Sequence, residues 1–139
     1  MGYLPIEDHG IVGDLPTAAL IGTDGTVDWL CLPAFDSPSI FASILDDEKG
    51  GHFKLQPERY DRSQQLYLPD TNVLLTRFLS PEGVAEILDF MPVDKDGQAR
   101  HRLVQEVLLF LAGLAGVLWK FAERPSECCQ HLRGVVGVE

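Results

Sequence analysis

Apolar and polar residues alternate along much of the first hundred positions with the period of two that is typical of β-strands. Residues 17–21 and 26–32 are rich in apolar and β-branched side chains, and Asp24 and Gly25 lie between them. Asp-Gly is a turn dipeptide because glycine tolerates positive φ, so we predict a β-hairpin. Alternation in its second strand places three side chains on one face of the sheet: Val27, Trp29 and Cys31.

Further strands follow from the same pattern. Ser80 to Gly83 reads SPEG, the pattern of a type I turn, and it separates two strongly apolar segments. The polar residues 57–65 are expected to form a loop. The remaining predicted strands are 51–56, 66–68, 72–79 and 84–91.

One short helix is predicted after Pro33, which should end the hairpin. Ser37 can cap a helix and Pro38 suits its first position. Four apolar residues then recur with helical spacing: Ile40, Phe41, Ile44 and Leu45. Short strands joined by turns, with one helix, predict an all-β fold, an antiparallel β-sandwich.

The pattern changes near the C-terminus. Residues 107–119 form a run of thirteen positions without a charge. Because a membrane-spanning helix needs about 20 apolar residues, this run is too short to cross a bilayer. We expect a helical tail here, and residues 107–139 do not fit the sandwich pattern.

Composition narrows the class of protein. The 139 residues suffice for one domain, and the net charge of −10 argues against nucleic-acid and anionic-membrane partners. Cys31, Cys128 and Cys129 are odd in number and lack metal-site spacing, which favours reduced thiols in a cytoplasmic protein. The N-terminus has no basic region followed by an apolar core, so it is not a secretory signal.

Carboxylates are the main candidates for acid–base chemistry, since glycosidases use two of them to flank the bond they cleave. Turn formation and helix capping are the alternative roles, as for Asp24 before Gly25. The four histidines lack the spacing of a metal site, and no nucleotide-binding or serine-hydrolase motif is present, so we expect no metal and no cofactor. The candidate carboxylates are Asp8, Asp14, Asp24, Asp28, Asp36 and Asp89.

Trp29, Phe35 and Asp36 have the chemistry of a sugar-binding rim. Aromatic rings stack on the apolar faces of sugars, while carboxylates bind sugar hydroxyls. The alternative is a tryptophan buried between sheets and a phenylalanine that closes the end of the sandwich.

Four blocks of sequence resemble the N-terminal domain of bacterial-type glycoside hydrolase family 15 proteins, the glucoamylase-like and trehalase-like enzymes. They occur in the family's order between about residues 3 and 106. The blocks are IEDHGIVGD at 6–14, TAALIGTDGTVDWLCLPAFDSPSIFASILD at 17–46, YLPDTNVLLTRFLSPEG at 67–83 and ILDFMPV at 87–93.

The resemblance implies a β-sandwich that precedes a much larger (α/α)6 barrel. In such proteins the barrel carries both catalytic glutamates, which hydrolyse α-glucosidic bonds with inversion and without a metal. We expect this chain to lack the barrel and to have no catalytic residue of its own, so none of three glutamates takes that role: Glu86, Glu106 and Glu123. The barrel-facing surface, left bare, is expected to favour self-association.

Two positions depart from the family's pattern. Pro16 stands where a polar or basic residue is usual, and Ala34 stands where a larger side chain is common. We expect a sandwich domain at 1–106 and a divergent tail at 107–139 that arose by frameshift or truncation. The alternatives are a stand-alone carbohydrate-binding or interaction module and a peripheral membrane protein held by residues 107–119.

Overall fold

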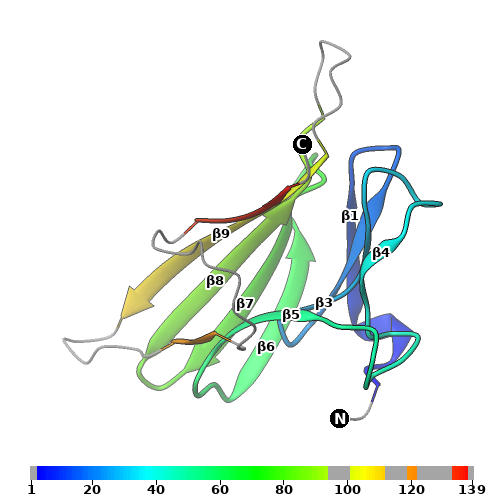
Figure 1. Cartoon of the computed structure of the whole chain (residues 1–139). Coiled ribbons are helices and arrows are strands. Elements are labelled where there is room, and N and C mark those ends of the chain that lie inside the picture. The colour runs from blue at the N-terminus through cyan, green and yellow to red at the C-terminus, as the bar shows by residue number, and fades with distance from the viewer. Residues whose placement is uncertain (1–2, 94–100, 112–118, 122–132, 138–139) are drawn as a thin grey trace.

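The computed structural model describes residues 3–93, 101–111, 119–121 and 133–137. Two antiparallel sheets contain more than half of the residues in this part of the chain, and turns and loops make up most of the rest (Figure 1). Residues from both sheets meet in one core cluster, so the architecture is the predicted all-β sandwich.

The first sheet has the order β1-β2-β3-β5-β10, and β4 also pairs with β3. Its strands are β1 (His9–Gly13), β2 (Ala18–Gly22), β3 (Thr26–Cys31), β4 (Ser39–Ala42), β5 (Phe53–Pro57) and β10 (Trp119–Phe121). The second sheet has the order β11-β9-β8-β7-β6. Its strands are β6 (Arg62–Tyr67), β7 (Leu74–Ser80), β8 (Gly83–Phe90), β9 (Arg102–Leu111) and β11 (Arg133–Gly137).

Core side chains come from alternate positions on facing strands. Val12 and Ile21 of the first sheet cluster with Leu74 and Leu103 of the second, all with 1% exposure or less. Gly10 allows the sheets to approach closely, because a Cβ at this position would collide with the Leu74 side chain. A second cluster is centred on Phe78, which packs edge-on against the Tyr60 ring with the ring centroids 4.8 Å apart.

The predicted hairpin is confirmed as β2 and β3. Gly25 in its turn has a φ of 79°, the left-handed conformation for which glycine was expected. The strands on either side of the SPEG turn are confirmed as β7 and β8.

The predicted alternation within β3 is wrong, because the register against β2 shifts. Leu20 pairs with Trp29 while Ile21 pairs with Val27, so Asp28 is an extra residue in β3. A β-bulge of this kind changes the face on which the following side chains lie. Val27 and Leu30 therefore both reach the core, and Trp29 is half-buried.

The predicted helix at 38–45 is also wrong, since residues 39–42 form β4. Ser37 closes the turn behind it instead of capping a helix ahead: its hydroxyl accepts the Ala34 N–H at 3.1 Å, and its own N–H donates to the Ala34 carbonyl at 3.0 Å. Ser39 and Phe41 then pair with β3. Within the described residues the one helical element is the 3-10 turn η1 (Ile6–Asp8).

The C-terminal region was expected to be helical, and this is wrong for its described part. Residues 107–111 continue β9, which pairs with β8 as far as Leu111, and residues 119–121 and 133–137 are strands. β9 thus passes through the predicted boundary at residue 106. The predicted loop at 57–65 is wrong in part, because Pro57 ends β5 and the polar residues Arg62 to Gln65 begin β6. The pattern also did not predict β1 as a strand.

Candidate functional site

A small pocket lies between the N-terminal segment and the first sheet. Its volume is about 50 Å³, which holds a few water molecules. Polar side chains predominate among the residues that line it: Tyr3, Leu4, His9, Asp24, Thr26, Asp28, Ser43, Ile44, Asp47 and His52.

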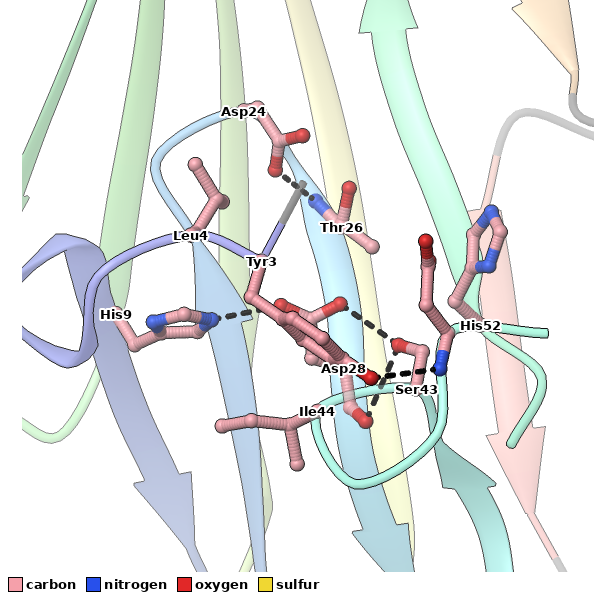
Figure 2. A pocket seen from close by; sticks show the side chains of 10 residues that line it. Tyr3, Leu4, His9, Asp24, Thr26, Asp28, Ser43, Ile44 and His52 are labelled. Atoms are coloured by element: carbon pink, nitrogen blue, oxygen red, sulfur yellow. Dashed lines mark hydrogen bonds and ion pairs between the residues drawn. The ribbon is translucent and has the colours of Figure 1, made fainter. Parts of the chain in front are cut away.

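Asp28 is the centre of this pocket. Figure 2 shows His9 and Ser43 pointing toward its carboxylate from opposite sides. His9 Nε2 lies 2.7 Å from Asp28 Oδ2, and the Ser43 hydroxyl donates to Asp28 Oδ1 at 2.9 Å. The bulge explains the position: β4 pairs with β3 from Trp29 onward and β5 pairs as far as Val27, so Asp28 lies between the two partners.

The contacts of the two ring nitrogens show how the imidazole of His9 is held. Its Nδ1 lies 2.9 Å from the Pro5 carbonyl oxygen, which can only accept, so Nδ1 carries a hydrogen. Nε2 faces the Asp28 carboxylate, and the His9 side chain is only 1% exposed. Ser43 donates to Asp28 and not to the imidazole, so the order of contacts in a Ser-His-Asp triad is not present. The cluster therefore joins the N-terminal segment, β1, β3 and the turn after β4, and it is no Ser-His-Asp nucleophile.

Asp24, at the other end of the pocket, is neutralised by Lys54. The two side chains lie 2.5 Å apart, and Asp24 Oδ1 also accepts the Thr26 N–H at 3.1 Å. Burial acts to raise the pKa of Asp24, but the bonds from Lys54 and Thr26 and the Lys54 charge outweigh it and hold that pKa below its ordinary value. Asp24 therefore has the turn-forming role, because its side chain accepts a hydrogen bond from the backbone two residues further on.

The three residues predicted to form a sugar rim are only partly together. Phe35 is 57% exposed on the turn between β3 and β4, and Asp36 beside it is exposed. Trp29 lies back in β3, half-buried, between its pairing partners Leu20 and Ala42. Of the predicted rim, only Phe35 and Asp36 lie together and exposed, on the turn between β3 and β4.

Asp14 and His101 form a second buried pair. His101 Nδ1 lies 2.5 Å from Asp14 Oδ2, and the side chains are 11% and 5% exposed. The pair joins the loop after β1 to the start of β9, across 87 positions of sequence. Nothing in the sequence indicated this contact, nor that between His9 and Asp28, because tertiary folding alone brings such distant residues together.

Asp89 is a buried carboxyl group in the core. It is 1% exposed, Gln105 Nε2 donates to its Oδ1 at 2.6 Å, and its Oδ2 has no hydrogen-bond partner among the described residues. Burial raises the pKa of Asp89 to about 7, against the lowering effect of the Gln105 hydrogen bond.

The described residues contain no group of three or more histidine, cysteine or acidic side chains placed to hold a metal ion. In the same part of the chain, no helix is long and apolar enough to cross a membrane.

Comparison with known proteins identifies relatives. Residues 2–133 match the family model described as trehalase-like, N-terminal. The chain is 39% identical over 113 residues to the trehalase of Thermoplasma volcanium, covering 75% of this chain and 18% of that protein. It is 43% identical over 92 residues to Trehalase 1 of Sulfolobus acidocaldarius, covering 65% and 16%, and 37% identical over 94 residues to the trehalase of Mycobacterium tuberculosis, covering 67% and 14%. No solved structure matches.

The β-sandwich and the family match together define an all-β domain of the N-terminal, trehalase-like class. The chain belongs to the family of trehalase-like N-terminal domains. It spans less than a fifth of the length of the relatives described above.

Proposed function

We propose that this chain is the non-catalytic N-terminal domain of an α-glucoside hydrolase of glycoside hydrolase family 15, trehalase-like or glucoamylase-like. The inverting hydrolysis is carried out by an (α/α)6 barrel outside these residues. The observation that carries the proposal is the match to the trehalase-like N-terminal family over residues 2–133. The segments aligned with three trehalases make up only 14% to 18% of those proteins.

The state of the carboxylates supports a non-catalytic role. Inverting glycosidases need two carboxyl groups about 6.5–9.5 Å apart with a sugar and a water between them. Asp14, Asp24 and Asp28 are each held by a basic side chain, and Asp89 is buried in the core. A pocket of about 50 Å³ is too small for a disaccharide.

The test is to assay residues 1–139 alone with trehalose, maltose and a maltodextrin, and to follow glucose release. We expect none. A hybrid in which residues 1–139 replace the matched segment of the Thermoplasma volcanium trehalase should hydrolyse trehalose. Glucose release by the isolated chain, or an inactive but folded hybrid, counts against the proposal.

A second proposal is a carbohydrate-binding or interaction module, and the observation that favours it is the exposed ring of Phe35 next to Asp36. Trp29, Phe35 and Asp36 would then contact the α-glucoside. Titration calorimetry with trehalose and maltotriose tests this, with Phe35→Ala as the variant and Leu45→Ala, another exposed apolar residue, as the control. Absence of heat with the wild-type chain at millimolar sugar would reject the module.

We also propose that the domain acts in the cytoplasm. Cys31 is a free, buried cysteine, and burial raises the pKa of its thiol, which keeps it unreactive. We further propose that the isolated chain self-associates through apolar surface that the rest of the enzyme would cover. The boundary between a domain at 1–106 and a tail at 107–139 stays a prediction.

A further inference from the structure

The second sheet carries apolar side chains on its outer face as well as on the face that packs on the core. In an antiparallel sandwich the outward positions of a strand are usually polar. Leu74, Phe78 and Ile87 point into the core, so their neighbours along each strand point outward. Strands β6 to β9 lie side by side in Figure 1, and six of their outward positions, here called the outer face, are apolar: Leu66, Leu75, Leu79, Val84, Leu88 and Leu108.

The outer face is separate from the core and reaches solvent. None of its six residues is part of either core cluster of described residues. Leu66 and Leu108 are 42% and 37% exposed, while Leu75, at the centre, lies between its pairing partners Leu66 and Leu88 and is 5% exposed. Contiguous apolar surface of this kind marks an interaction site.

One ion pair stands in the middle of the outer face. Arg77 Nη2 on β7 lies 2.6 Å from Glu86 Oε1 on β8, and the two residues pair directly across the strands. Because the two charges neutralise each other, a partner that covered them would bury a pair and not a lone charge. Along the strands the ion pair is flanked by two apolar cross-strand pairs, Leu75 with Leu88 and Leu79 with Val84.

This pattern is complementary to itself. A twofold axis that runs parallel to the strands, midway between β7 and β8, places β7 of one copy over β8 of the other at the same level. Arg77 then lies over the partner's Glu86, and Leu75 lies over the partner's Leu88. Opposite charges therefore meet, and apolar side chains meet apolar ones. Two sheets packed face to face cross at about 30°, so the centre of the face makes the contact.

We propose that the outer face binds a second copy of this chain about this twofold axis. The inference rests on the self-association proposed above and names the surface and the residues that carry it. Four strands about 4.8 Å apart, each with about six residues of 3.4 Å, give a face of roughly 20 Å by 20 Å. A face of this size suits a weak, reversible dimer.

The experiment exchanges the two central charges one at a time. Sedimentation equilibrium of residues 1–139 in about 0.15 M salt, which screens the net negative charge, should show monomer and dimer in exchange. Arg77→Glu makes the centre of the face acidic and Glu86→Arg makes it basic, so each variant alone should dimerise at least about tenfold more weakly. An equal mixture of the two variants should restore the dimer, because every central charge then faces an opposite one.

Matched variants on the turn after β4 control for net charge and for lost apolar surface. Lys49→Glu and Glu48→Arg make the same charge changes at exposed positions. Each should dimerise as the wild type does, and their mixture should dimerise no more tightly. Leu66→Ser should weaken the dimer, while Leu45→Ser, at another exposed leucine, should not. Circular dichroism checks that each variant is folded.

Three results would overturn the inference. The first is a wild-type chain that stays monomeric up to millimolar concentration, and the second is a mixture of folded charge variants that associates as weakly as its components. The third is association that neither charge exchange alters, which would assign self-association to another surface. Glucose release by the hybrid trehalase described above is a separate readout, so loss of this dimer leaves the proposed role of the domain standing.

Discussion

Asp28 binds two side chains at once because it is the extra residue of a bulge. The bulge places its carboxylate between the ends of two neighbouring strands, where His9 and Ser43 reach it. The side chain of His9 is almost fully buried, so loss of its partner leaves a polar group without compensation.

Asp28→Ala should therefore lower the free energy of unfolding by about 2–4 kcal/mol, since it leaves both partners unsatisfied. Ser43→Ala, which removes one hydroxyl and its bond, should cost about 1 kcal/mol. Urea denaturation at pH 7 measures both. Equal effects of the two substitutions would show that Asp28 is not the centre of the cluster.

Asp89 makes stability depend on pH. Its pKa of about 7 in the folded protein lies above the value of 3.8 for an exposed aspartate, so folding takes up a proton. The resulting stabilisation is fully present below pH 4, the unfolded value, and is lost as the pH rises through 7. An amide at this position keeps an acceptor for Gln105 and has no charge to bury.

Asp89→Asn should gain stability relative to the wild type as the pH rises. The difference in the free energy of unfolding should grow by about 1.4 kcal/mol per pH unit between pH 5 and 7, to at most about 4 kcal/mol. Urea denaturation at pH 5.5, 7 and 8 measures this difference. A difference that does not change with pH would mean that Asp89 is ionised in the folded protein.

At the scale of elements, the β2–β3 turn depends on Gly25. Its positive φ disfavours other residues, and a Cβ would also collide with the backbone carbonyl of Leu55 in β5. Gly51 has a similar φ of 67°, yet its Cβ would meet nothing closer than the Ile40 carbonyl oxygen at 4.0 Å.

Gly25→Ala should destabilise the protein by about 3 kcal/mol or more, because strain and a backbone collision add. Gly51→Ala isolates the strain and should cost about 1 kcal/mol. Thermal unfolding of the two variants compares these effects, and a similar loss in both would exclude the collision with β5.

Side chains of β6 and of the segment between β6 and β7 cover the free edge of β1. The Tyr67 hydroxyl accepts the Ile11 N–H at 2.9 Å and donates to the Ile11 carbonyl at 2.8 Å, and Asn72 donates to the Gly13 carbonyl at 2.9 Å. Satisfied backbone groups cannot pair with a second chain, so these contacts protect an edge strand from association.

Tyr67→Phe should expose this edge and increase dimer formation, which sedimentation velocity measures. Tyr3→Phe removes a hydroxyl that accepts the Asp47 N–H, away from the β1 edge, and should leave the dimer fraction unchanged. If both variants behave as the wild type does, the edge is protected by other means.

At the scale of the whole molecule, negative charge opposes the exposed apolar surface. The net charge is −10 with a pI near 4.7, while Leu15 and Phe35 are 87% and 57% exposed. Repulsion between copies acts over about 10 Å at 0.1 M salt and weakens as salt is added.

We therefore expect self-association of the isolated chain to increase with sodium chloride at pH 7 and as the pH approaches 4.7. Light scattering against salt and pH gives the mass. A monodisperse monomer at high concentration in 1 M salt would contradict the expectation that apolar surface left bare drives association.

The sequence by itself determined the fold class and the family. Period-two alternation and turn residues such as Asp24-Gly25 are local signals, so they predicted the sandwich, the β2–β3 hairpin and the β7–β8 pair. Local signals also misled: Ser37-Pro38 has the form of a helix start, but pairing of residues 39–42 with β3 outweighed it. The first residues of β6 are all polar, so no alternation of apolar and polar residues marked them as an edge strand.

Only the tertiary structure decided which side chains meet. His9 and Asp28, Asp14 and His101, and Tyr67 and Ile11 are joined across long stretches of chain. A one-residue bulge, which no local pattern indicated, placed Asp28 between its partners and turned Leu30 into the core. Long-range contacts and register depend on how whole strands pack together, and residue type at a single position does not encode them.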